Sequence, residues 1–268
     1  MSMKIKTADQ KRAELLAKIP TFKLMDDTYM NVFFNEQPKL VELLLRILLQ
    51  KDDLKVISSR TQRPLKNIQG RSLILDIDAV DGDNVFYDVE VQQESSGADP
   101  ERARLHTSMI DSNALLPGDQ FVKLPESYVI FITREDYFDA GLPFYTINRH
   151  IEQLNMQPFL DRQHIIYVNG KFDDNSAIGR LMHDFRCENP SDMYYKELAE
   201  RAHYLKETEG GRDNMCKAME ELLNDEKIQT ALRMLSKNKY SYEEIAEISD
   251  LTVEQIRKIA EEFKPVSA

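Results

Sequence analysis

The amino-acid sequence predicts an α/β domain that is followed by an all-helical C-terminal region. Two dense apolar runs, SYVIFIT at residues 127–133 and HIIYVN at residues 164–169, are typical of strands buried on both faces. From Pro190 onward the pattern is helical throughout. Glycine is scarce, at 9 of 268 residues, and this scarcity disfavours a turn-rich all-β architecture.

The N-terminal part of the chain contains a predicted arm, a core helix and a strand. Residues 1–19 are expected to form a polar helix or a frayed arm. Pro38 precedes the segment KLVELLLRILLQ, whose apolar spacing predicts a core helix that begins near this proline. Residues 54–58 are expected to form a short strand.

The middle part contains a predicted hairpin and a long helix. Residues 72–80 and 85–92 alternate in polarity around a DGDN turn, which is a hairpin signal. A helix is then expected to begin near Pro100 and to end at Leu116, because a Pro-Gly pair follows.

The last part of the chain is predicted to be helical. A helix is expected near residues 176–186, and breaks are expected at Gly210-Gly211 and near residues 237–241. No internal repeat interrupts this pattern. The predicted organisation is an N-terminal arm or helix at residues 1–19, a core at residues 20–187 and a helical C-terminal region at residues 188–268.

The charge balance and the cysteine content exclude several classes of protein. The chain has 35 Lys and Arg against 46 Asp and Glu, a net charge of −11 at pH 7, which argues against coating nucleic acid through bulk positive charge. Two cysteines cannot form a disulfide framework, and they indicate a reducing compartment. Because no signal peptide or membrane-spanning run is recognisable, we expect a cytoplasmic protein with no membrane partner.

The acidity is concentrated in the predicted hairpin. Residues 71–94 hold seven acids and one base, a net charge of −6, whereas the other 244 residues carry −5. A three-residue loop with Asn84 in the left-handed conformation puts the acids on one face. In that register the cross-strand partners are Asp76 with Glu90, Asp78 with Asp88, and Ile74 with Gln92.

Two interpretations of this acidic face remain open. Like charges directly opposite one another destabilise a hairpin unless something compensates them. On a solvated face, water and salt would screen the repulsion. In a divalent-metal site, Mg²⁺ or Mn²⁺ would cancel it through hard oxygen ligands.

The hairpin motif resembles the core of the PD-(D/E)XK nucleases, in the form Asp76 … Glu90-Val91-Gln92. Segments around the motif resemble the recombination-promoting nuclease and transposase branch in the same order: LMDDTYMNVFF, KLVELLLRILLQ, RARLHTSMIDSNALLPGDQFVKLPESYVIFIT and IGRLMHDFRCENPSDMYYKELAERAHYLKETEGG. The resemblance covers roughly residues 20–225. It implies a restriction-endonuclease-like α/β core, with a mixed central sheet flanked by helices, and a metal-dependent DNA endonuclease activity.

The resemblance also implies the roles of the motif residues. Asp76 and Glu90 would bind Mg²⁺ or Mn²⁺, and the backbone carbonyl of Val91 would complete the ligand set. Gln92 takes the position usually held by lysine. Its amide can orient water or a phosphate oxygen, but it cannot supply a positive charge. Asp76, Glu90 and Gln92 are therefore the expected catalytic residues.

Further acids are candidates for the same site. Glu42 lies in the apolar helix and is either an accessory acid of the site or the partner of Arg46 in an i,i+4 pair. Asp78 and Asp88 are either a second metal site or the solvated end of the hairpin. Asp27 matches the aspartate of the family's opening segment, but a helix N-cap is the preferred interpretation.

The helix after the hairpin carries two arginines that could contact DNA. Arg102 and Arg104 are expected to bind phosphates near the metal. The alternative is that they form salt bridges, with Glu94, Glu101 and Asp111 as the nearby acids. His106 is expected to be a packed or surface histidine rather than a metal ligand.

The C-terminal helices resemble a helix-turn-helix. Ser241 with Glu244, and Thr252 with Gln255, form two capping boxes. Asp250 stands where that motif usually has glycine, and few basic residues follow, so a packing or protein-interaction pair of helices is favoured.

Two functions follow from the sequence. The first is a metal-dependent DNA endonuclease that binds DNA weakly and with the help of its metal. The second is a catalytically degenerate nuclease fold that acts as a DNA- or protein-interaction module. No Gly-rich nucleotide motif supports an enzyme acting on another phosphorylated substrate, and the sequence supports no particular oligomeric state.

Overall fold

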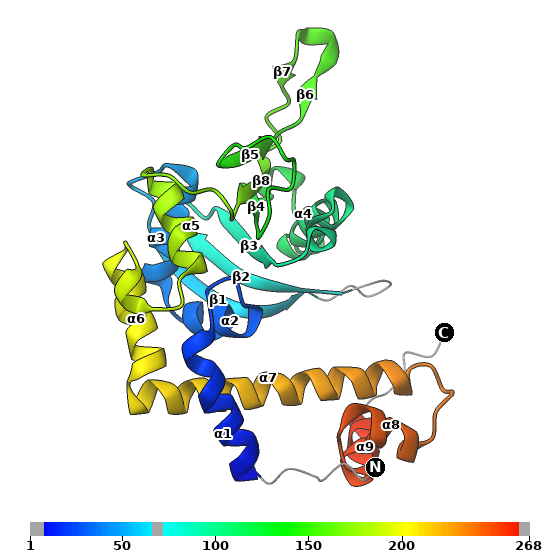
Figure 1. Ribbon diagram of the computed structural model, residues 1–268. Coiled ribbons are helices and arrows are strands. Elements are labelled where there is room, and N and C mark those ends of the chain that lie inside the picture. Colours follow the sequence, from blue (N-terminus) through cyan, green and yellow to red (C-terminus); the bar gives the residue numbers. More distant parts are fainter. Residues whose placement is uncertain (1–7, 66–71, 263–268) are drawn as a thin grey trace. The chain divides into compact units, whose positions relative to one another are not determined.

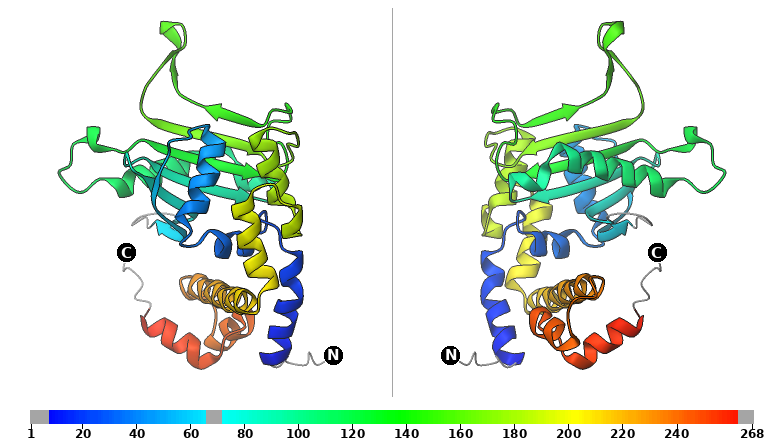
Figure 2. Two further views of the ribbon diagram at one scale, coloured as in Figure 1. Left: turned by 90° about the vertical axis from the view of Figure 1, so that its left-hand side faces the viewer. Right: turned by 90° about the vertical axis from the view of Figure 1, so that its right-hand side faces the viewer.

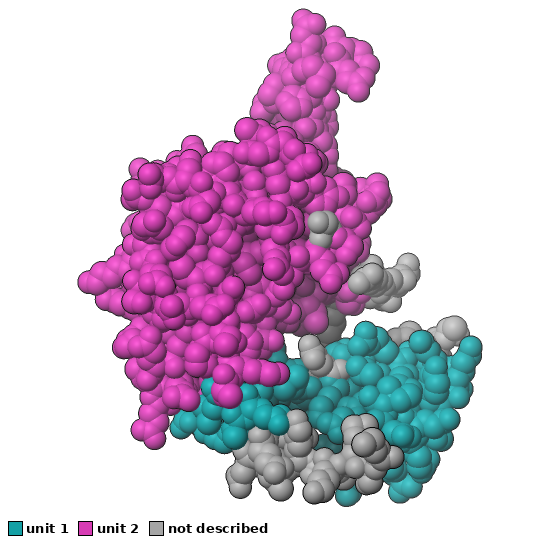
Figure 3. Space-filling model, in the orientation of Figure 1, with its two compact units in different colours: residues 1–16, 213–268 teal, residues 17–212 magenta. Residues whose placement is uncertain are grey.

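The structure is a computed structural model that describes residues 8–65 and 72–262 (Figure 1). The remainder of the predicted N-terminal arm, residues 1–7, lies outside the described residues. The chain divides into two compact units, one of residues 17–212 and one of residues 1–16 with 213–268 (Figure 3). The boundary predicted from the sequence is at residue 187, whereas the larger unit extends to residue 212. None of the described helices is long and apolar enough to cross a membrane.

The larger unit is built on a six-stranded mixed sheet. In sheet order, strand two is antiparallel to strands one and three, and strands three to five are parallel to one another. Strand six, at the edge, is antiparallel to strand five. The mixed α/β class predicted from the sequence is therefore confirmed. In order across the sheet, the strands are β1 (Val56–Leu65), β2 (Leu73–Asp81), β3 (Phe86–Gln92), β4 (Ser127–Thr133), β8 (Gln163–Asn169) and β5 (Phe144–Ile147).

Helices cover both faces of this sheet (Figures 1 and 2). On one face lie α3 (Pro38–Leu49) and α5 (Ala177–Arg186), and α4 (Pro100–Ala114) lies alone on the other. The smaller helices α2 (Asp27–Phe34) and α6 (Lys196–Glu207) pack beside one another. The apolar spacing of α3 explains its position, since its buried side chains occur at the intervals of one helix face.

The largest difference from the predicted elements is β1. The sequence predicts a strand at residues 54–58, but β1 runs for ten residues to Leu65. Its residues VISSRTQRPL are mostly polar and only partly buried, because β1 is an edge strand. A polar edge strand lacks the apolar alternation that identifies a strand in sequence, so its second half was missed.

A short β-ribbon projects from the sheet between β5 and β8 (Figures 1 and 2). Its two strands are β6 (His150–Ile151) and β7 (Gln157–Pro158), which pair antiparallel. Neither these strands nor β5 is predicted from the sequence, since each is short and carries mixed polarity.

The β2–β3 hairpin has the predicted register over its paired residues, from Ile77 with Val89 to Val80 with Phe86. The predicted partners Asp76 with Glu90 and Ile74 with Gln92 lie beyond the end of this pairing. Asp78 is paired with Asp88, and Asn84 in the loop has φ +61°. The Asp81 carboxylate organises this turn, since it accepts the backbone N–H groups of Asp83 and Val85, both at 2.9 Å, and the Tyr87 hydroxyl at 2.6 Å.

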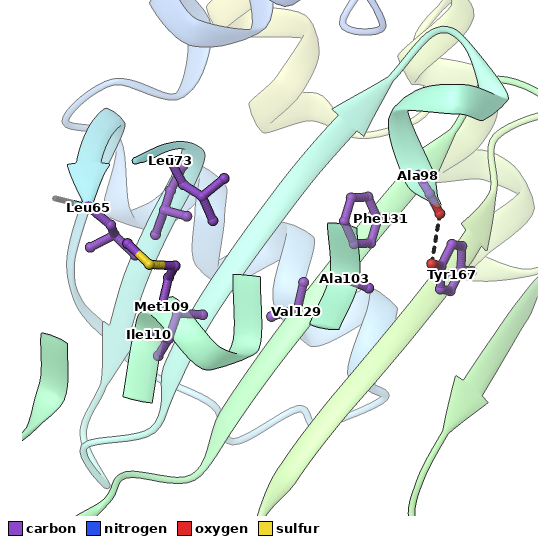
Figure 4. Packing of buried hydrophobic residues seen from close by; sticks show 10 residues of the cluster. Leu65, Leu73, Ala98, Ala103, Met109, Ile110, Val129, Phe131 and Tyr167 are labelled. Atoms are coloured by element: carbon purple, nitrogen blue, oxygen red, sulfur yellow. Dashed lines mark hydrogen bonds between the residues drawn. The ribbon is translucent and has the colours of Figure 1, made fainter. Parts of the chain in front are cut away.

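The acidic face of the hairpin is not a solvated face, so that interpretation is wrong. Asp88 and Glu90 are fully buried and Asp78 is 4% exposed. Helix α4 packs over this face, and its Met109 and Ile110 join an apolar cluster with side chains of β4 and β8 (Figure 4). The acids therefore lie at the boundary of the hydrophobic core.

The smaller unit contains α8 (Tyr242–Ser249), α9 (Val253–Glu262) and most of α1 (Ala8–Lys18) and α7 (Glu209–Leu235). Both predicted capping boxes form at the starts of α8 and α9. Asp250 between them has φ +52°, the backbone conformation for which the helix-turn-helix motif usually has glycine. The apolar side chains of α7, α8 and α9 share one core cluster, which includes Met234, Ile245 and Ile256.

We expect the Asp81 turn to be the main local stabiliser of the hairpin. Asp81→Ala should lower the free energy of unfolding by about 3 kcal/mol, because it removes three hydrogen bonds and leaves the buried Tyr87 hydroxyl without its acceptor. Tyr87→Phe should cost about 1 kcal/mol. Urea unfolding would measure both. Asp83→Ala is the matched control, since only the backbone of Asp83 bonds here; equal midpoints for the two alanine variants would contradict this role.

Candidate functional site

The two carboxylates of the predicted motif, Asp76 on β2 and Glu90 on β3, lie next to each other. The backbone N–H of Asp76 donates to Glu90 Oε1 at 3.0 Å. The backbone N–H of Val91 donates to Asp76 Oδ2 at 3.1 Å. Each carboxylate is therefore held by the backbone of the opposite strand. This reciprocal bonding holds the two side chains together, and Arg102 of α4 contacts Glu90.

Asp88 and His106 form a fully buried pair beside Glu90. His106 Nδ1 lies 2.8 Å from Asp88 Oδ2 and 3.8 Å from Glu90 Oε1. Arg102 Nε donates to His106 Nε2 at 3.3 Å, so the proton of the neutral ring is on Nδ1, facing Asp88. Burial lowers the pKa of His106; the charge of Glu90 opposes this shift and the charge of Arg102 adds to it. His106 is thus packed, as expected, but it packs against the candidate site.

Arg102 enters the site from the first turns of α4. Its Nη2 lies 2.9 Å from Glu90 Oε2, and its Nη1 donates to Gln92 Oε1 at 3.4 Å. The Gln92 amide in turn donates to Glu90 Oε2 at 3.4 Å. The acid that pairs with Arg102 is therefore Glu90, rather than one of the three acids considered from the sequence. The Arg104 side chain is exposed, and within the described part of the chain it makes no hydrogen bond or ion pair.

Asp27 is an exposed acid whose charge acts on Asp76, and its interpretation as a helix N-cap is wrong. The cap position of α2 is Asp26, and α2 begins with Asp27. The Asp27 carboxylate accepts Asn31 Nδ2 at 3.0 Å, and its charge contributes to raising the pKa of Asp76. The match to the aspartate of the family's opening segment was the signal in the sequence that pointed to this position.

Glu42 and Asp78, two of the candidate accessory acids, have other partners. Glu42 lies 2.7 Å from Arg46 Nη2 and accepts the backbone N–H of Val56, which agrees with the i,i+4 alternative. Asp78 is bound by Arg60 and Arg63. The third accessory candidate, Asp88, is in the site. We define the acidic cluster as Asp27, Asp76, Asp88 and Glu90.

The acidic cluster carries more negative charge than its surroundings neutralise. Burial and then the charge of Glu90 raise the pKa of Asp76 well above its ordinary value. Burial and then the charge of Asp88 raise the pKa of Glu90 to about 8. Burial, with the charge of Asp76, does the same to Asp88. Such shifts are typical of functional sites, because burying several carboxylates together without a cation is costly.

The residues present fit a divalent cation. Asp88 and Glu90 each offer a carboxylate oxygen, and these oxygens and a ring nitrogen of His106 lie within 4.8 Å of one another. Asp88 Oδ1 is buried and has no hydrogen-bond partner within the described residues. An oxygen-rich donor set with a deficit of positive charge suits Mg²⁺ or Mn²⁺.

The raised pKa of Glu90 predicts how the metal-free protein responds to pH. Between its ordinary value of 4.5 and about 8, folded Glu90 retains a proton that the unfolded chain has lost. The free energy of unfolding should therefore fall as pH rises from 5 to 8 in EDTA. Mn²⁺ at pH 8 should raise the melting temperature, because it binds the folded state.

Glu90→Gln should weaken both effects, and thermal melts of the two proteins would measure them. Glu135→Gln is the control, since this exposed acid lies outside the acidic cluster and its partner is Lys171. A pH slope that is identical in the wild type and in Glu90→Gln would contradict the assignment.

Comparison with known proteins agrees with this geometry. The family model described as PD-(D/E)XK nuclease family transposase matches residues 24–250, which include the hairpin, α4 and most of the C-terminal helices. No curated protein and no solved structure matches the chain significantly. The matched region covers the larger part of the sequence and every residue of the acidic cluster, so this chain belongs to the PD-(D/E)XK nuclease family of transposases.

Proposed function

We propose that this protein is a metal-dependent DNA endonuclease that hydrolyses phosphodiester bonds. The observation that carries the proposal is the acidic cluster, in which the fully buried carboxylates of Asp88 and Glu90 contact one guanidinium and one neutral imidazole among the described residues. Family membership indicates a nuclease, and the cluster supplies a reason for a divalent cation. DNA is the substrate that the family implies.

Asp76 and Glu90 are the proposed metal ligands, with the carbonyl of Val91. Reciprocal bonds to the opposite backbone keep both carboxylates in place before a cation arrives. When bound, Mg²⁺ or Mn²⁺ would polarise the phosphodiester and lower the pKa of a bound water. Asp88 lies two residues before Glu90 on β3, and its charge acts on Glu90.

Gln92 and Arg102 together take the place of the usual lysine. The Gln92 amide can orient a water molecule or a phosphate oxygen, but it carries no charge. Arg102 supplies a positive charge within hydrogen-bonding distance of both Gln92 and Glu90. His106 accepts a bond from Arg102 and donates to Asp88, so it positions the guanidinium without contacting the substrate.

The distribution of charge indicates weak binding of DNA. The chain carries a net charge of −11, and the bound cation would offset part of the acidity in the hairpin. Contacts to the DNA backbone should therefore depend on metal and on ionic strength. Such weak, salt-dependent contacts agree with an enzyme that binds DNA transiently.

Removing one ligand should abolish cleavage. Glu90→Gln and Asp76→Asn should each reduce Mg²⁺-dependent nicking of supercoiled plasmid by at least 100-fold, because the cation loses a charged ligand. Glu42→Gln is the matched control, since Glu42 is an acid of the same unit with partners outside the cluster. Agarose gels would measure nicking, and calorimetry with Mn²⁺ would measure binding.

A protein that binds no Mn²⁺ at millimolar concentration would overturn the nuclease proposal. Nicking that survives in Glu90→Gln would overturn the assignment of the site. The absence of metal binding would instead favour the interaction module. The observation that favours this second function is Gln92, which occupies the position where the motif usually has lysine.

Variants of the two arginines of α4 should distinguish an effect on catalysis from an effect on DNA binding. Arg102→Gln should lower the nicking rate at least tenfold at saturating DNA, because it removes the charge next to Glu90 and Gln92. Arg104→Gln should leave that rate nearly unchanged. It should reduce the slope of the logarithm of the DNA-binding constant against the logarithm of salt concentration by about 1, which corresponds to one lost phosphate contact. Rates and fluorescence anisotropy over a salt series would measure these effects; equal rates for both variants would contradict the roles.

A further inference from the structure

A second polar pocket adjoins the other end of the β2–β3 hairpin. It has a volume of about 430 Å³ and lies between β1, β2, the start of β3 and the C-terminal end of α4. The side chains that matter here are Arg60, Arg63, Asp78, Ser59, Phe86 and Ile110. Neither the acidic cluster nor the proposed cleavage reaction uses this pocket.

One buried carboxylate holds two guanidinium groups at the pocket. Arg60 Nε lies 3.1 Å from Asp78 Oδ1, and Arg63 Nη1 lies 3.1 Å from Asp78 Oδ2. The three groups together carry a net charge of +1. Each arginine has five N–H donors, and the bonds to Asp78 use only the Nε of Arg60 and the Nη1 of Arg63. The pocket therefore presents positioned donors that suit an anion, and planar guanidinium groups match phosphate oxygens well.

The other wall of the pocket is apolar and aromatic. The Arg63 guanidinium lies 5.6 Å from the centre of the Phe86 ring, and Ile110 of α4 belongs to the apolar cluster beside it. Ser59 Oγ is buried and has no hydrogen-bond partner among the described residues. An apolar wall next to arginines and an unused hydroxyl suits a flat heterocycle attached to a phosphate.

The pocket is close to the acidic cluster. Asp78 is two residues from Asp76 along β2, which corresponds to about 7 Å. It is also the cross-strand partner of Asp88. A nucleotide in the pocket would therefore lie within one or two nucleotide steps of a phosphodiester at the cluster, given a rise of about 3.4 Å per nucleotide.

We propose that this pocket binds one nucleotide, with its phosphate on Arg60 and Arg63 and its base against Phe86 and Ile110. Two sources have this chemistry, a nucleotide of the DNA strand and a free nucleoside monophosphate. The inference that DNA supplies this nucleotide rests on the proposed function. The inference that the pocket binds a nucleotide does not.

Binding in EDTA tests the proposal without requiring metal or cleavage. The probes are deoxyadenosine monophosphate, measured by calorimetry, and a fluorescein-labelled oligonucleotide, measured by anisotropy. The double variant Arg60→Gln/Arg63→Gln should weaken binding of at least one probe tenfold or more. Arg180→Gln is the matched control, because this exposed arginine is on α5 and packs on Tyr194 away from the pocket. Inorganic phosphate should compete with the probe.

A second variant tests the pocket without removing charge. Ala114 lines the pocket and is exposed at the end of α4, so Ala114→Trp should fill the space without disturbing the core. It should cause the same loss of binding. Weakened binding of the monophosphate identifies a free nucleotide as a ligand, and weakened binding of the oligonucleotide alone identifies a strand nucleotide.

The pocket proposal is overturned if neither probe binds, or if both variants bind both probes like the wild type. The probes are measured in EDTA, where neither metal binding nor cleavage takes part. The nuclease proposal is tested by nicking and Mn²⁺ binding, and the pocket proposal by binding of the probes. Failure of one can therefore be distinguished from failure of the other.

Discussion

The reciprocal bonding of Asp76 and Glu90 is the constraint on which the rest of the site depends. Each carboxyl group accepts a hydrogen bond from a backbone N–H of the opposite strand, so the two acids stay together inside the protein. Buried charges of the same sign are costly unless another charge compensates them. Helix α4 supplies Arg102 as partial compensation, and burial, followed by the charges of the neighbouring acids, raises the pKa of Asp76, Asp88 and Glu90. The hairpin, its turn at Asp81 and the position of α4 therefore act together to hold an arrangement suited to a cation.

The buried carboxylates at the two ends of the hairpin have different charge partners. At the Glu90 end, the acids outnumber the positive charges that contact them, and a divalent cation is the natural complement. At the Asp78 end, two arginines surround one carboxylate and leave positive charge in excess. Asp88 lies between these ends, opposite Asp78 in register and next to Glu90. The same sheet face thus offers one position for a cation and, close by, one for an anion, an arrangement that suits a phosphodiester substrate.

Sequence reasoning succeeded where the controlling interactions are local. The strand alternation and the left-handed Asn84 gave the register of the hairpin, and the capping boxes gave the starts of α8 and α9. It failed where the partner is distant along the chain. Glu42 resembles a site acid because it interrupts an apolar stripe, yet its partners are Arg46 and the start of β1. Asp27 resembles a cap, yet its charge acts on Asp76, 49 residues away. The polar edge strand β1, which carries Arg60 and Arg63, was only half predicted for the same reason.

By itself, the sequence determined the α/β class, the hairpin that brings Asp76 and Glu90 together, and the resemblance to a nuclease family, because alternation, turn chemistry and motif spacing are encoded in neighbouring residues. Only the tertiary structure decided that α4 buries the acidic face and that Asp27 and His106 join it, while Glu42 and Asp78 find other partners. These outcomes depend on which helix packs on which face of the sheet. Burial then turns a run of acids, which could have been a solvated surface, into a cluster whose charge calls for a cation.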